Sequence, residues 1–175
     1  MITVEKISEG IRKEGLNFGM PMAFIKLGEG TLYSSVDELV REVLMKTRCK
    51  WVCLLGESTT QVGMGTLAKG LSSLGLYTEV EVSGSVRDPG WLHVVDRWVV
   101  DYAENSLFNY NALRSSDMVR FTIKDRGDLS LMKSGFEELK LFSGTKYVKV
   151  ESKEVFDEVF QFARKYERSR IYREA

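Results

Sequence analysis

Two cysteines are the first residues whose type and spacing could do chemistry, because Cys49 and Cys53 match the opening of a C-x3-C-x2-C iron–sulfur motif. The third thiolate of that motif would come from residue 56, which is Gly56. Residues 51–56 are predicted as a strand, in which positions four apart share a face and lie roughly 13 Å apart at ~3.3 Å per residue. Metal–sulfur bonds of ~2.3 Å are too short for the pair to share a metal. We therefore predict buried structural thiols and no metal site.

A second set of candidates follows the apolar runs of the chain, each of which ends in a polar, charged or glycine residue. Strands that simply emerge into water show the same pattern, so the pattern alone does not define a site. In α/β folds, however, binding and catalysis are placed at the carboxyl ends of parallel strands. We therefore expect five of these side chains to converge around one binding mouth. They are Lys26, Glu57, Ser83, Asp101 and Lys124.

The elements that must position these residues alternate between strand and helix patterns. Strands are predicted at residues 22–27, 51–56, 77–83, 97–102, 118–124 and 146–151. Helices are predicted at residues 35–47, 60–74, 106–113, 129–139 and 155–166. The first helix has a capping box at Ser35 and Glu38, and Gly75 is placed to end the second. The tail, residues 164–175, is predicted as an amphipathic helix.

Six β-then-α units with short loops indicate parallel strands joined by right-handed crossovers. The connection over residues 83–96 is the exception, since it is more loop than helix. Six units are too few to close an eight-stranded barrel. The predicted fold class is therefore α/β, either a partial barrel or an open doubly wound sheet.

Composition predicts one domain over residues 1–175, since 175 residues with 43% apolar content can bury a real core. The formal net charge is zero, which provides no global field for nucleic acid or an anionic membrane. No apolar run approaches the ~20 residues of a membrane span. The first ten residues lack the apolar core of a signal peptide. With two cysteines and no disulfide framework, the predicted location is the cytoplasm.

Three segments resemble the 7-carboxy-7-deazaguanine synthase family of radical S-adenosylmethionine enzymes. Residues 9–27, EGIRKEGLNFGMPMAFIKL, resemble its E-x-x-S-I-Q-G-E-G-x-x-x-G-x-P-x-x-F-I-R-L opening. The segment LLGESTTQ, residues 54–61, is similar to its T-G-G-E-P-x-x-Q, and EVSGS, residues 81–85, to its E-T-N-G-T. The resemblance implies a partial (β/α)6 barrel and a homodimer, or a heteromer with a related enzyme.

The resemblance also implies roles for particular residues. Glu14, Gly15 and Lys26 would line a pocket for a pterin-like carboxylate, with Lys124 from the strand-end pattern beside them. Lys26 stands where the family has Arg, which keeps the charge and loses bidentate geometry. Glu57 would meet the amino group of S-adenosylmethionine, or else only hold its loop. The residues implied to bind that cofactor are Gly56, Glu57, Ser83 and Gly84.

The main departure from the family lies after FIKL, where the family carries three cysteines that hold a [4Fe–4S] cluster. Here Gly30 takes the place of the first cysteine, and a helix pattern begins by Ser35. The cluster loop and the family's Mg²⁺-binding threonine therefore have no counterpart. Without three clustered thiolates, no iron site can reduce S-adenosylmethionine. We expect no [4Fe–4S] cluster and no radical chemistry by this chain alone.

Three functional hypotheses follow. The first is a cluster-free relative that binds a pterin, a deazapurine or S-adenosylmethionine as a binding or regulatory protein. The second is an inactive subunit of a radical enzyme. The third is a non-radical enzyme using Glu57, Asp101, Lys124 or Asp125, but no nucleophile–base pair or metal-ligand set supports it, and no catalytic residue is assigned. The single histidine, His93, is predicted to have a packing or surface role, and the nearby Trp91 and Trp98 are predicted to fill core.

Overall fold

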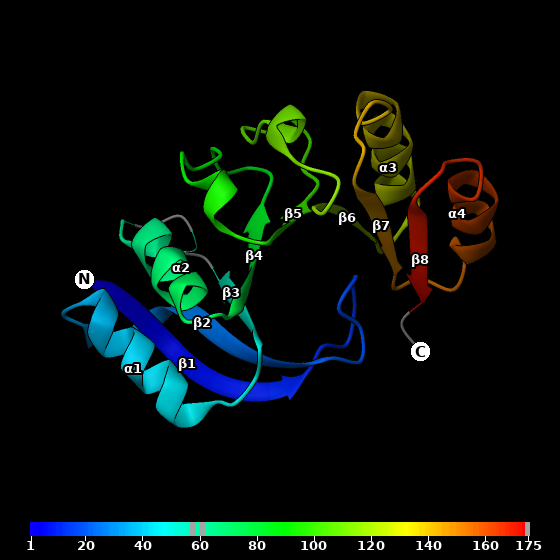
Figure 1. Cartoon of the computed structure of the whole chain (residues 1–175). Coiled ribbons are helices and arrows are strands. Elements are labelled where there is room, and N and C mark those ends of the chain that lie inside the picture. The colour runs from blue at the N-terminus through cyan, green and yellow to red at the C-terminus, as the bar shows by residue number, and fades with distance from the viewer. Residues whose placement is uncertain (57–58, 60–61, 174–175) are drawn as a thin grey trace. The chain divides into compact units, whose positions relative to one another are not determined.

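The computed structural model describes residues 1–56, 59 and 62–173. By the density of contacts, the chain divides into two compact units, residues 1–82 with 89–98 and residues 83–88 with 99–175 (Figure 1). Each unit combines parallel strands with helices, which confirms the predicted α/β class. That both units form one domain stays a prediction, and each unit is described by itself below.

The first unit is built on four strands that are hydrogen-bonded in chain order. Strands β1 and β2 pair antiparallel, and β2, β3 and β4 pair parallel. Their bounds are β1 Ile2–Ile11, β2 Pro21–Tyr33, β3 Trp51–Gly56 and β4 Tyr77–Ser83. The predicted ranges of β3 and β4 are confirmed to the residue. Strand β3 is almost wholly apolar, whereas in β4 the buried Val80 and Val82 alternate with Glu79 and Glu81.

Strand β1 is a correction to the predicted six-unit order, because the chain opens with a strand that no pattern indicated. It pairs along almost its whole length with β2, which extends β2 to Tyr33, six residues past the predicted end. A shift of register at Val4 brings the backbone of β1 against Gly30, where an added Cβ would lie 2.8 Å from Glu5 Cα. Gly30 thus permits this close approach of two strands.

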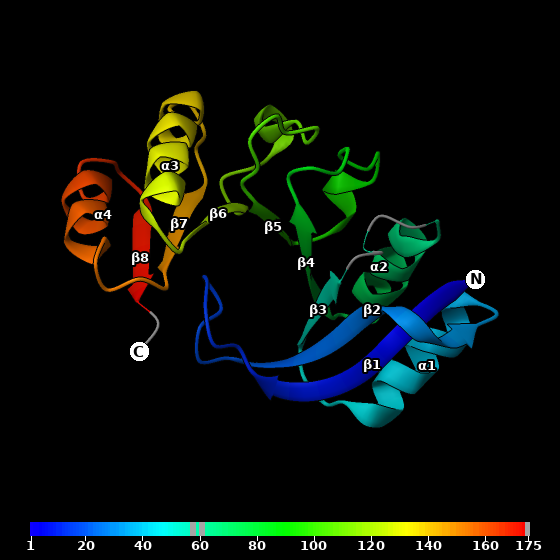
Figure 2. The ribbon, with the colours of Figure 1, turned by 180° about the vertical axis from the view of Figure 1, so that it is seen from behind.

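Helices α1 (Val36–Lys46) and α2 (Met64–Ser73) pack against one another on one face of this unit (Figure 2). The predicted cap of α1 is confirmed: Ser35 Oγ accepts from the Glu38 backbone N–H, and Glu38 in turn accepts from Ser34. Past the end of α2, Gly75 has φ +73°, the left-handed conformation expected of a helix terminator. The N-cap of α1 and the glycine that ends α2 could be predicted from the sequence because each acts within one turn of its helix.

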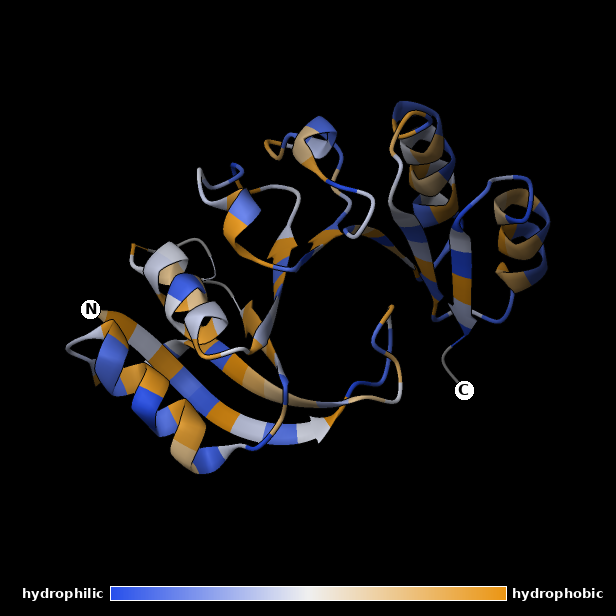
Figure 3. Cartoon of the chain, viewed as in Figure 1, coloured by the Kyte–Doolittle hydropathy of each residue, from blue (hydrophilic) through white to orange (hydrophobic). Residues whose placement is uncertain are grey.

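The second unit has an all-parallel strand set. Its strands are β5 Arg97–Asp101, of which residues 99–101 belong to this unit, β6 Met118–Ile123, β7 Thr145–Val150 and β8 Ser169–Arg173. Helices α3 (Arg126–Glu138) and α4 (Phe156–Ala163) turn their apolar faces inward (Figure 3). Phe136 of α3 is fully buried among aromatic rings, with ring centres 5.1 Å from Phe121 and 5.0 Å from Tyr166.

Two helix predictions in the second unit are wrong. The segment 106–113 contains only a short 3-10 turn, Tyr110–Ala112. The tail is not an amphipathic helix, because its residues 169–173 form β8 and pair with β7 from Lys146 to Val150. The charged residues of that segment are compatible with a helix as well as with a strand. The segment forms a strand because β7 offers unpaired backbone N–H and C=O groups for it to hydrogen-bond.

Candidate functional site

Strand β4 carries two glutamates that point to one face of the first unit. In the run Thr78–Val82, Glu79 and Glu81 alternate with apolar residues, and alternate residues of a strand share a face. Glu79 pairs in register with Cys53 of β3, so the thiol lies on the face of the two carboxylates. All three side chains are largely shielded from solvent, which is unusual for acids unless they are paired.

The β1–β2 loop, residues 12–20, brings partners to these carboxylates. It is closed at its base by two backbone hydrogen bonds between Arg12 and the Gly19–Met20 pair. One terminal nitrogen of Arg12 lies 3.1 Å from Glu79 Oε1 and also ion-pairs with Glu81. Asn17 donates to Glu79 Oε2 at 3.0 Å. The loop therefore places a cation and an amide against two acids of a strand.

Arg97, at the start of β5, completes this arrangement within the same unit. Its Nη1 donates to Asn17 Oδ1 at 2.6 Å and lies 3.6 Å from Glu79, while its guanidinium stacks over the Trp51 ring at 5.2 Å. We call these side chains the Arg12 cluster. Its members are Arg12, Asn17, Cys53, Glu79, Glu81 and Arg97.

Burial shifts the pKa values of two groups in the Arg12 cluster. It raises the pKa of Glu79 above its ordinary value, since desolvation outweighs the nearby Arg12 and Arg97. The pKa of the Cys53 thiol is raised well above its ordinary value, first by burial and then by Glu81 and Glu79. Arg12 is only 7% exposed, and among the described residues its Nε has no hydrogen-bond acceptor. Arg12 Nη2 and Glu79 Oε1 also lack a hydrogen bond of good geometry there, although they lie 3.1 Å apart as an ion pair, so Nε is the donor left with neither kind of partner.

A metal cation is an alternative occupant of the cluster, because ligand atoms of Cys53, Glu79 and Glu81 lie within 4.8 Å of one another. Arg12, however, already ion-pairs with both carboxylates, and so supplies the positive charge that a metal would bring. The raised pKa of Cys53 also opposes thiolate ligation. The arrangement is better suited to recognising a polar ligand than to holding an ion.

The burial of the Cys53 thiol predicts slow reaction with an alkylating reagent. At pH 8 we expect iodoacetamide to modify Cys49, which is partly exposed, at least ~100-fold faster than Cys53, which must await opening of the fold. Reaction at Cys49 should itself be slower than for a free thiol, because burial and then Glu9 raise its pKa. Mass spectrometry of peptides over time measures both rates. Equal rates in the folded protein would contradict the packing described for β3.

The predicted pocket residues of the first unit divide between the loop and the strand. Glu14 and Gly15 lie in the same β1–β2 loop as Arg12, and Gly15 is buried with φ +84°. Phe24 of β2 pairs in register with Cys53 of β3. Lys26 lies two residues after Phe24 and therefore shares the face of the Arg12 cluster. Its amine ion-pairs with Glu5 of β1 at 2.7 Å, where both side chains are about half exposed. Their roles in binding stay predictions.

The predicted cofactor residues have clear backbone roles where they are described. Gly56 has φ +113°, and an added Cβ would overlap the Leu27 carbonyl oxygen of β2. Glu57 lies outside the described residues. In the second unit, Ser83 is hydrogen-bonded to Ser85 at 2.5 Å, and the Gly84 N–H donates to the Asp101 carbonyl at 2.7 Å. Cofactor binding by these residues stays a prediction.

The remaining candidates occupy the second unit. Lys124 is exposed just after β6. Asp125 is the N-cap of α3 and accepts from the Gly127 and Asp128 backbone N–H groups, a structural role that accounts for its position. Asp101 is paired with Arg120, with oxygen–nitrogen distances of 2.5 and 3.0 Å. Convergence of the strand ends around one mouth stays a prediction.

Sequence reasoning missed Arg12, Asn17, Glu79 and Arg97. One signal could have found part of the set: a buried parallel strand is expected to be continuously apolar, but β4 places acids at alternate positions. That alternation marks a polar, shielded face. No local signal identifies Arg12 or Asn17, because their roles depend on where the loop folds.

The residues present do not fit a [4Fe–4S] cluster. Such a cluster needs three thiolates near one another, and the chain has two cysteines. The two sulfurs also have separate partners, Glu9 for Cys49 and Glu81 for Cys53. The connection from β2 to α1 consists of Ser34 and Ser35, which leaves no loop in which cluster ligands could lie.

The fold defines the class first: it is a mostly parallel α/β fold with helices. Among solved structures, the fold is similar to that of QueE from Escherichia coli, with a TM-score of 0.76 and 12% sequence identity over 99% of this chain and 94% of that chain. No protein family model and no curated protein matches the sequence. None of the helices in the described ranges is long and apolar enough to cross a membrane.

Proposed function

We propose that this chain is a small-molecule-binding protein on a QueE-like scaffold and does not carry out radical chemistry by itself. The observation that carries the proposal is the Arg12 cluster, in which a shielded guanidinium keeps Nε unpaired beside two carboxylates. A ligand acceptor would satisfy that donor. A partly satisfied buried network of this kind is otherwise costly to keep.

Stability alone is a poor reason for such a cluster. Desolvating an arginine and two glutamates costs several kcal/mol per ion, and well-packed apolar residues often serve equally well or better. Here the charges lie on β4 and on a loop, and Asn17 and Arg97 extend the polar network by further hydrogen bonds. Recognition of a polar ligand would explain why the Arg12 cluster keeps charged and amide side chains that packing of the core does not require.

The chemistry of the cluster suits a planar, polar heterocycle that carries a carboxylate, such as a pterin or a deazapurine. Arg12 Nε can donate to a ligand oxygen or ring nitrogen, and Glu79 with its raised pKa can share a proton with a ring N–H. Glu14, Gly15 and Lys26 belong to the loop and strand that carry the cluster. The resemblance to 7-carboxy-7-deazaguanine synthase, the family of QueE, supports the same ligand class.

Binding can be measured by calorimetry with a carboxylated pterin, 7-carboxy-7-deazaguanine and S-adenosylmethionine. We expect one of the first two to bind, and Arg12→Lys to weaken it about 10- to 100-fold, because lysine keeps the charge for Glu79 and Glu81 but lacks Nε and the planar fork. The retained charge keeps the carboxylates paired, so the variant should fold.

Lys13→Met is the matched control, since Lys13 is the exposed neighbour of Arg12 and should leave the affinity unchanged. Failure of the wild-type protein to bind any of the three compounds would refute the proposal. Binding of S-adenosylmethionine alone would refute the proposed ligand class. Iron retained after anaerobic reconstitution would overturn the cluster-free part of the proposal.

A further inference from the structure

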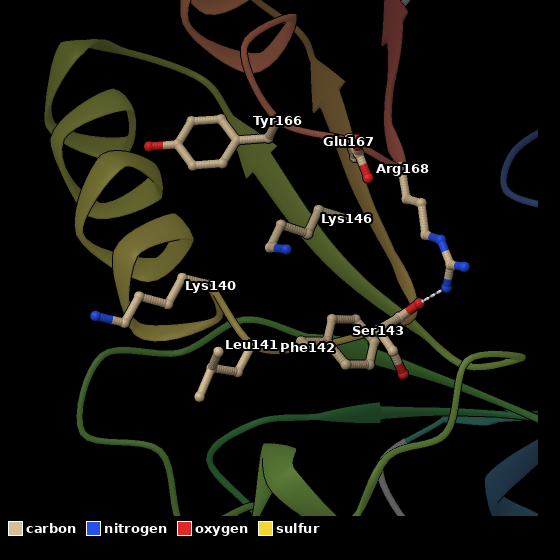
Figure 4. A pocket seen from close by; sticks show the side chains of 8 residues that line it. All are labelled: Lys140, Leu141, Phe142, Ser143, Lys146, Tyr166, Glu167 and Arg168. Carbon is tan, nitrogen blue, oxygen red and sulfur yellow. Dashed lines mark hydrogen bonds between the residues drawn. The ribbon is translucent and has the colours of Figure 1, made fainter.

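A separate cavity of about 390 Å³ lies at the amino ends of β7 and β8 in the second unit. It is bordered by the segment that follows α3 and by the turn that precedes β8. Figure 4 shows the Lys146 side chain in the midst of the residues that line it. Lys124 and Glu151 follow the carboxyl ends of strands in this unit, so the cavity does not belong to the strand ends discussed above.

Lys146 is the unusual residue of this cavity. Its side chain is buried, with 4% of the residue exposed, although it is the second residue of β7. Its amine lies 5.9 Å from the Phe136 ring centre and 5.8 Å from that of Phe142. Among the residues that the structure describes, no carboxylate or other acceptor pairs with this amine. Burial lowers the pKa of Lys146 from its ordinary value.

The two aromatic rings do not account for an unpaired amine on a side chain that is otherwise buried. Cation–π attraction extends to about 6 Å from the ring centre, so both contacts are near its limit, where it contributes least. Removing an ammonium from water costs several kcal/mol after relaxation. Lys149 of the same strand shows the ordinary solution, an ion pair with Glu151 at 3.1 Å. Lys146 lacks any such partner in the described chain.

The walls of the cavity are positively charged. Lys140, Lys146 and Arg168 line it, against the single carboxylate of Glu167. Arg168, whose φ is +58°, donates from Nη1 to the Ser143 carbonyl and so ties the two rims together (Figure 4). The Tyr166 hydroxyl is already used, because it donates to Glu137 at 2.6 Å. The cationic groups are therefore the ones left for a ligand.

We propose that this cavity binds a small phosphate-bearing anion, with the Lys146 amine as its central contact and Arg168 and Lys140 at the rim. A phosphate offers several acceptor oxygens and a charge near −2, which matches the excess of cations in the walls. The anion supplies the partner that Lys146 lacks. This site is independent of the Arg12 cluster and of the function proposed for it.

The test is calorimetry and thermal unfolding with inorganic phosphate and pyrophosphate, in a phosphate-free buffer at fixed ionic strength. Wild-type protein should bind at least one of them and melt at a higher temperature in its presence. Lys146→Met should weaken binding at least about tenfold and remove the thermal response. Without ligand, the same variant should melt no lower than wild type, because it no longer keeps an unpaired amine on a largely buried side chain.

Lys165→Met is the control, since Lys165 is exposed near the same turn and does not line the cavity; its affinity should equal that of wild type. Citrate is tested as a carboxylate anion for comparison. If the protein binds citrate but neither phosphate nor pyrophosphate, the proposed ligand class is wrong. No binding by wild type, or equal binding by Lys146→Met, would overturn the site. If Lys146→Met does not fold, Arg168→Met must weaken binding about threefold for the proposal to stand.

Discussion

Replacing Arg12 by methionine should lower the free energy of unfolding by about 3–5 kcal/mol at pH 7. The change removes the ion-pair partner of Glu79, whose side chain is 1% exposed, and of Glu81 at 13%. Both carboxylates would then be buried without that compensating charge. Urea unfolding followed by circular dichroism measures the loss, and an unchanged slope against denaturant would show that the same fold is being compared.

The loss caused by Arg12→Met should depend on pH in a defined direction. Burial raises the folded-state pKa of Glu79 above its ordinary value of 4.5, and removing Arg12 takes away its largest opposing influence. A raised carboxyl pKa means that stability is full below pH 4.5, where both states are protonated, and declines as pH rises through the folded-state pKa. The difference between wild type and Arg12→Met should therefore shrink as pH falls from 7 to 4.

Lys26→Met is the matched comparison, because it also breaks an ion pair of the first unit. Lys26 and Glu5 are 50% and 44% exposed, so water replaces the lost partner. We expect a cost of no more than about 1 kcal/mol. An equally small cost for Arg12→Met would show that water reaches the Arg12 cluster, and would remove the argument for a shielded binding site.

Substituting alanine for Gly56 should cost about 3 kcal/mol or more. The residue has φ +113°, which strains any side chain, and the new Cβ would overlap the Leu27 carbonyl oxygen on the neighbouring strand. The obstacle is backbone held in the β2–β3 ladder, so it cannot rotate away as a side chain would. Thermal and urea unfolding both report the change.

Gly75→Ala provides the control for Gly56→Ala, since Gly75 also has a positive φ of +73° but no atom within 4 Å of the added Cβ. It should cost about 1 kcal/mol, the strain of the backbone conformation alone. Similar costs at both glycines would mean that β2 yields to the new methyl group. A much larger cost for Gly56→Ala than for Gly75→Ala would show that Gly56 has a structural role, which is independent of any cofactor binding.

Local patterns in the sequence were sufficient for the class of fold and for many of its elements. The apolar run of β3, the alternating pattern of β4, the cap of α1 and the stop at Gly75 are all determined within a few residues of chain. The motif order that resembles 7-carboxy-7-deazaguanine synthase also agrees with the QueE-like fold. The count of two cysteines by itself rules out a three-thiolate cluster.

The existence of the edge strands and the residues that meet at the two candidate sites depend on tertiary structure and could not be predicted from local sequence patterns. Strands β1 and β8 form because a neighbour offers unpaired backbone groups, which no local pattern reveals. Asn17 meets Glu79 across 62 residues of chain and Arg97 across 80. Lys146 resembles any other strand lysine until its surroundings exclude water. Charge pairing and desolvation depend on distances in space, and sequence spacing does not fix distances between elements this far apart.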